Sequence, residues 1–173
     1  MNKLLILIII GAGLYYYITW NPSTESIVNE MEFGDKMIHK DRTYYSDWSK
    51  EIESISGYVR RKDRHYDENF PIITYDLALT TGDYNDPNIV EVRHQGGGNY
   101  LWLSKTKPTG TITFYHTVPS SIVSQSKLDA INEGDTIEIL AKVSKNSEIK
   151  NDTGAFVRLM HSNHKMILVS DVK

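Results

Sequence analysis

The first apolar stretch of the chain is a run of 17 uncharged residues at positions 4–20. A helix rises about 1.5 Å per residue, so this run spans about 26 Å as a helix, near the lower limit for crossing a bilayer. Three consecutive tyrosines at positions 15–17 and Trp20 lie near its end, where an aromatic belt at the membrane surface is expected. We therefore predict a transmembrane anchor over residues 1–20, in contact with the lipid bilayer through residues 4–20.

A cleaved signal peptide is the alternative interpretation of the same segment. The small residues at positions 11–13 suit a cleavage site, which would release a secreted or periplasmic protein. However, the apolar core before that site would be short, and residues 14–18 would give the mature chain an apolar, aromatic start. The pattern favours an uncleaved signal anchor. Lys3 precedes the segment and acidic residues follow it, which predicts a single-pass protein whose C-terminal domain lies outside the cytoplasm.

The next part of the chain, residues 21–54, reads as a helical stalk or linker. Pro22 ends the anchor helix. Apolar residues then recur at helical spacing over 24–33 and again over 46–55, which predicts two short amphipathic helices.

From residue 55 onward, apolar and polar residues alternate with the period of a β-strand. One helix, over residues 120–132, interrupts the strands and ends before Gly134. Several short strands with one late helix predict a mainly β (α+β) domain over residues 55–173, in the form of a small antiparallel β-barrel, OB-like, with a β-sandwich as the alternative. The predicted strands cover residues 72–80, 89–93, 101–103, 111–115, 136–143, 155–160 and 165–169.

The amino-acid composition excludes some kinds of site and argues against one class of partner. The chain contains no cysteine, which excludes disulfides, thiolate metal sites and cysteine nucleophiles. It carries 19 basic and 22 acidic residues, a net charge of −3. A general nucleic-acid-binding domain is normally basic, so this balance argues against a nucleic-acid partner.

One basic cluster, over residues 60–66, has tyrosines at its edges. Cations interleaved with aromatic rings are suited to single-stranded nucleic acid or phosphate. They are equally suited to anionic lipid headgroups. A solvated loop neutralised by its neighbouring acidic residues is the alternative, and the pattern favours it. Together with two aromatic residues near the glycine-rich turn at 96–98, the candidate binding residues are Tyr58, Arg60, Arg61, Lys62, Arg64, Tyr66, Tyr100 and Trp102.

His161 and His164 are the candidate metal ligands, because two imidazoles at this spacing can bind one ion on a tight turn. Zinc would need further ligands, which His94, His116 and Asp152 supply only where the fold brings them close. A polar hairpin tip explains the same residues without a metal. We therefore predict no cofactor.

No motif predicts catalysis. Residues 83–88 begin like a calcium loop, but Asn88 and His94 stand where that motif requires glycine and glutamate. The serine-elbow and zinc-protease motifs are absent.

The sequence therefore favours a membrane-anchored extracytoplasmic structural or interaction protein. It would contact other proteins of an envelope, secretion or virion membrane assembly. An OB-like module that binds oligosaccharide or single-stranded nucleic acid is the alternative.

Overall fold

The structure is a computed structural model that describes residues 31–32, 37–96 and 99–173 of the chain. The predicted anchor over residues 4–20 lies outside the described residues, as does most of the helix expected over 24–33. Within the described ranges, no helix is both long enough and apolar enough to cross a bilayer.

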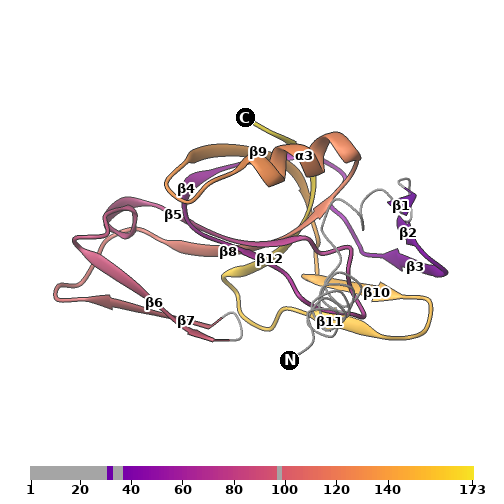
Figure 1. The fold of residues 1–173 in the computed structure, drawn as a ribbon, viewed down its shortest axis with the longest axis horizontal. Coiled ribbons are helices and arrows are strands. Elements are labelled where there is room, and N and C mark those ends of the chain that lie inside the picture. The colour runs from indigo at the N-terminus through magenta and orange to yellow at the C-terminus, as the bar shows by residue number, and fades with distance from the viewer. Residues whose placement is uncertain (1–30, 33–36, 97–98) are drawn as a thin grey trace, which may run out of the picture.

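Five strands close into a barrel, which rules out the sandwich alternative (Figure 1). Around the barrel the order is β4, β5, β8, β12 and β9, and β9 pairs with β4 to complete the circle. The barrel strands are β4 (Glu53–Arg64), β5 (Tyr75–Thr80), β8 (Ile112–Pro119), β9 (Thr136–Val143) and β12 (His164–Val172).

The expectation of an all-antiparallel barrel is wrong for one strand pair, because β8 and β12 are parallel. Connectivity explains this exception. β5 and β9 both pair antiparallel with β4, β8 is antiparallel to β5, and β12 is antiparallel to β9. β8 and β12 must therefore run in the same direction where they meet.

The barrel interior is filled by alternating side chains of its strands. On β9, Ile137, Ile139 and Ala141 are buried, as the period-two pattern of residues 136–143 predicted. Fully burying one aliphatic side chain contributes about 1.5–3 kcal/mol. The buried members of this core are Val59, Leu77, Leu79, Leu128, Ile131, Ile137, Ile139, Ala141, Ile167, Val169 and Val172.

A second, five-stranded sheet packs beside the barrel over its own core, which includes Tyr44, Phe70, Ile149 and Met166. Its strands are β1 (Met31–Glu32), β2 (Met37–His39), β3 (Arg42–Tyr45), β10 (Glu148–Asn151) and β11 (Phe156–Arg158).

The helix expected over residues 46–55 is not formed. Residues 46–52 are irregular, and the last three expected helical residues instead begin strand β4. The apolar face of the expected helix was Trp48, Ile52 and Ile55, yet Ile52 is exposed, Trp48 packs against the core of the second sheet and Ile55 packs against the barrel core. Strand pairing with β9 therefore outweighed the local helical spacing. Met31 and Glu32, at the end of the other expected helix, also lie in a strand.

A two-stranded hairpin, here called the arm, extends to one side of the barrel (Figure 1). It consists of β6 (Val90–Gly96) and β7 (Asn99–Ser104), preceded by the short 3₁₀ helix η1 (Gly82–Asn85). Trp102 on the arm packs edge-on against Phe114 of β8 and Tyr84 of η1. Tyr100 donates a hydrogen bond to Asp63 of β4. The inner side of the arm thus contacts the barrel.

Helix α3 (Ile122–Ala130) lies within the helix predicted over 120–132. Its first turn is closed by a capping box in which the Ser121 hydroxyl accepts from the Ser124 amide, and Ser124 accepts from the Ser121 amide. We expect Ser121→Ala to lower the free energy of unfolding by about 1 kcal/mol, the usual cost of losing an N-cap side chain. Urea denaturation measures this difference. Ser120→Ala is the matched control, and an equal effect in both variants would contradict the assignment.

Candidate functional site

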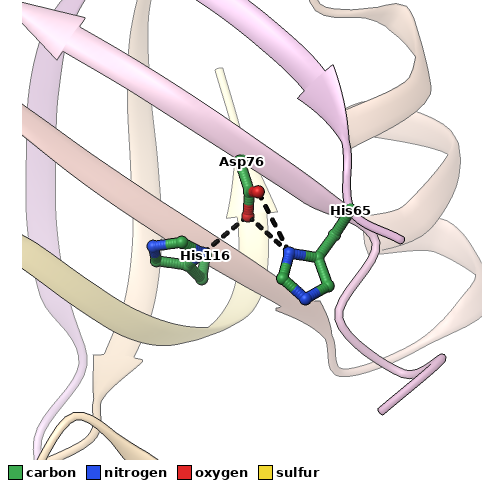
Figure 2. Close-up of side chains that lie close together, drawn as sticks. All are labelled: His65, Asp76 and His116. Atoms are coloured by element: carbon green, nitrogen blue, oxygen red, sulfur yellow. Dashed lines mark hydrogen bonds and ion pairs between the residues drawn. The ribbon is translucent and has the colours of Figure 1, made fainter. Parts of the chain in front are cut away.

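His65, Asp76 and His116 come together on the outside of the barrel (Figure 2). Asp76 on β5 lies directly opposite His116 on β8, so both side chains project from the same face of the sheet. Their neighbours Leu77 and Tyr115 pack into the barrel core, which places Asp76 and His116 on the outer face. His65 directly follows β4 and is positioned by the hydrogen bond from its backbone amide to the Thr74 carbonyl.

The carboxylate of Asp76 lies between the two imidazoles. Its Oδ1 is 2.6 Å from Nδ1 of His116, and both of its oxygens are 3.0 Å from Nδ1 of His65. His116 is buried, whereas Asp76 and His65 are half-buried at the rim. The three side chains therefore share one partly enclosed polar site.

A third imidazole continues this site. His164, the first residue of β12, has its Nδ1 3.1 Å from Nε2 of His116. Its ring stacks on Phe114 with centroids 4.6 Å apart, and Phe114 in turn contacts Trp102 of the arm. We call His65, Asp76, His116 and His164 the imidazole cluster. The rings of Phe114 and Trp102 lie beside it and connect it to the arm.

The electrostatics fix two protonation states in this cluster. Burial alone would raise the pKa of Asp76, but the close approach of His116, the hydrogen bond to His65 and the charges of both imidazoles outweigh it and lower that pKa well below its usual range. Burial, followed by the charges of His116 and His161, lowers the pKa of His164 to about 4. At neutral pH Asp76 is an anion and His164 is a neutral imidazole.

Two buried ring nitrogens of the cluster have no hydrogen-bond partner among the described residues: Nδ1 of His116 and Nε2 of His65. His116 Nδ1 is close to Asp76 but is not aligned to donate to it. Unsatisfied buried polar atoms are rare in folded proteins and call for a water, an ion or a functional explanation. The donor set of two imidazoles and a carboxylate is one that binds divalent transition metals.

Residues 60–64 of the predicted basic cluster lie on strand β4 instead of in a loop, residues 65–66 follow the strand, and the cations interact with groups of the same domain. Arg60 donates to the carbonyl groups of Asn85 and Val90. Lys62 donates to the carbonyl groups of Asp129 and Ile131 at the end of α3.

The remaining candidates divide between the interior and the surface. Arg61 pairs with Glu133 and lies over the ring of Tyr100. Arg64 lies over the ring of the exposed Tyr66. Tyr58, Tyr100 and Trp102 are all half-buried, and the last two contact the barrel from the arm. The structure therefore does not bring the predicted binding residues into one open groove.

The two predicted metal ligands lie near each other, with ring centroids 5.5 Å apart, but His161 is exposed. Of the residues expected to complete that site, only His116 is brought to His164. Asp152 instead accepts a hydrogen bond from the Thr43 amide, and the side chain of His94 lies outside the described part of the chain. Metal binding by His161 and His164 stays a prediction.

Sequence reasoning missed His65 and Asp76. The available signal was Asp76 itself, a carboxylate between apolar residues of a predicted strand, where it needs a partner to be buried. Its partner His116 is 40 positions away and becomes a neighbour only through the pairing of β5 with β8.

No protein-family model, curated protein or solved structure matches this chain.

Proposed function

We propose that this chain is a membrane-anchored extracytoplasmic interaction protein built on an OB-like barrel. The strand order supports the OB-like assignment, since five Greek-key strands with a helix before the fourth are typical of that fold. The apolar segment at 4–20 and the charge balance around it support the anchor and its orientation. Its partners are the lipid bilayer and other proteins of an envelope, secretion or virion membrane assembly.

The observation that carries the interaction role is a set of exposed apolar side chains on the second sheet and just after the end of its strand β11. Phe156 is 61% exposed and Met160 is 83% exposed. Tyr45, Lys150 and Phe156 are paired across β3, β10 and β11, so their side chains share one face. We call Tyr45, Phe156 and Arg158, together with Met160 two residues after the end of β11, the edge surface.

The composition of the edge surface suits a protein partner. Aromatic residues, methionine and arginine are the types enriched in protein–protein interfaces. Arg158 and Lys150 both pair with Glu148, which fixes two cations beside the exposed apolar groups. β11 is also an edge strand of its sheet, next to which a partner segment can lie.

The alternative of an oligosaccharide or single-stranded nucleic-acid site receives less support. It requires exposed aromatic rings across a sheet face. Tyr100 and Trp102 instead face their own barrel, and the cations at Arg60 and Lys62 bind backbone carbonyls.

The anchor is tested by fractionation of the full-length chain with a C-terminal tag. We expect the protein to stay in carbonate-washed membranes at its full mass. In intact cells stripped of their outer layers, external protease is expected to remove the tag. A shortened soluble product, or a tag protected until the cells are opened, would contradict the proposed topology.

The interaction role is tested by Phe156→Asp combined with Met160→Asp in the full-length chain. Truncating or charging the apolar centre of an interface commonly costs more than 1 kcal/mol per residue, so we expect at least about a tenfold loss of complex. Native electrophoresis of detergent-solubilised membranes, with chemical crosslinking, measures the complex.

The matched control is Ile122→Asp combined with Val123→Asp, which changes two equally exposed apolar residues on α3. We expect the control to remain in the complex. A wild-type chain that migrates alone, or an edge-surface variant that melts normally and stays in the complex, would overturn the proposal.

A further inference from the structure

We propose that His65, Asp76 and His116 form a binding site for a divalent transition metal, with Zn²⁺ as the ion. One ligand atom from each side chain lies within 4.8 Å of the others, and the three come from separate barrel segments (Figure 2). Two imidazoles and one carboxylate are an established zinc ligand set that leaves a coordination position open.

The spacing of the ligand atoms fits one ion with small adjustments. Two atoms that each bind zinc at about 2.1 Å are about 3.4 Å apart in tetrahedral geometry. The Asp76 oxygens lie 3.0 Å from His65 Nδ1, and Oδ1 lies 2.6 Å from His116 Nδ1. An ion therefore requires the carboxylate to separate from each imidazole by less than 1 Å, and both Asp76 and His65 are only half-buried.

The orientation of His116 is the strongest argument for an ion. Its Nδ1 is only 2.6 Å from Asp76 Oδ1, yet this buried nitrogen makes no hydrogen bond. A nitrogen lone pair close to a carboxylate is repulsive unless a cation lies between them.

The second ring nitrogen of His116 is oriented as in known metal sites. Nε2 lies 3.1 Å from Nδ1 of His164, whose ring is fixed by stacking on Phe114. A metal-binding histidine usually donates its other N–H to such a partner, which fixes its tautomer and orientation. His164 is then a positioning residue and not a ligand.

The surrounding charges also favour a cation. Asp63 on β4 lies directly opposite Asp76 on β5, and like charges at paired positions destabilise a sheet. Asp63 is partly neutralised by Arg61 and accepts a hydrogen bond from Tyr100. Among the described residues, the partners of Asp76 are the two imidazoles, and each can bind a metal through the Nδ1 atom that lies next to the carboxylate.

The test uses the full-length chain, purified in detergent with a tag that contains no histidine and stripped with a chelator. Isothermal titration with ZnCl₂ and elemental analysis after gel filtration measure affinity and stoichiometry. We expect one Zn²⁺ per chain and a melting temperature that rises on loading. Asp76→Asn and His65→Gln are expected to weaken binding at least about 100-fold, and His164→Gln about 10- to 100-fold, as for a partner of a ligand.

His161→Gln is the control, because His161 is exposed and outside the three ligands. It is expected to bind as the wild type does. Loss of binding in His161→Gln with retention in His65→Gln would overturn the proposal and favour the His161–His164 pair. Absence of zinc from the loaded wild type would also overturn it and leave a hydrogen-bonded cluster. His65 is at the rim, so its variant tests the site even where Asp76→Asn fails to fold.

Discussion

Gly110→Ala is expected to lower the free energy of unfolding by about 3–5 kcal/mol, the largest single effect we predict. Gly110 has φ +107°, and a Cβ built there overlaps the Thr81 carbonyl oxygen and lies 2.7 Å from its carbon. The contact is with backbone, so it cannot be relieved by a rotamer change. Urea denaturation followed by circular dichroism measures the loss.

The clash occurs where the arm leaves the barrel. The chain enters and leaves the arm through two adjacent segments, joined by hydrogen bonds from the Thr81 amide to the Thr111 carbonyl and from the Asp83 amide to the Thr109 carbonyl. An added Cβ at Gly110 would push apart the segments at 81–83 and 109–111, which position the arm against Phe114.

Gly154→Ala is the matched control for Gly110→Ala. Gly154 also has a positive φ, +88°, but a Cβ there meets no atom within 4 Å. It therefore bears only the conformational cost of the left-handed region, about 1–2 kcal/mol. Equal losses in the two variants would show that backbone conformation alone, without the close approach of Thr81, explains the requirement for glycine.

The barrel strands could be predicted where one face is buried and the other is exposed to solvent, because apolar and polar residues then alternate in the sequence. Residues 136–143 alternate strictly, and they form β9 with the predicted bounds. Strand β4 was hidden because its Arg60, Arg61, Lys62 and Arg64 read as a solvated loop. Those cations bind carbonyl, carboxylate and aromatic partners that are distant in the sequence. A local sequence pattern cannot reveal such partners.

Prediction of the candidate site from the sequence required knowledge of the strand register, more than prediction of the fold did. Local spacing pointed to His161 and His164, because residues three apart are visible in the sequence. The pairing of Asp76 with His116, and the approach of His65, follow from the closure of the barrel. A one-residue shift between β5 and β8 would turn one of the two side chains into the barrel core.

Asp76→Ala is expected to destabilise the metal-free protein by about 3 kcal/mol at pH 7, because it removes the carboxylate that hydrogen-bonds to His65 and pairs with the enclosed His116. Asp76→Asn is expected to recover only part of this loss, since its amide oxygen can still accept from His65 but the amide has no charge to pair with His116. Urea denaturation in the presence of chelator measures both. Glu68→Ala, at an exposed carboxylate, is expected to stay within about 0.5 kcal/mol of the wild type.

The contribution of Asp76 to the free energy of unfolding is expected to decrease as the pH falls. The folded protein lowers the pKa of Asp76, whereas the unfolded chain has a value of about 3.9. The unfolded state therefore takes up a proton first as the solution is acidified, and the stabilisation from Asp76 is complete above about pH 5 and declines below about pH 4. The gap between wild type and Asp76→Ala is expected to narrow steadily from pH 5 towards pH 3. A gap that stays constant, or widens in acid, would mean that the carboxylate is not stabilised as an anion by His65 and His116.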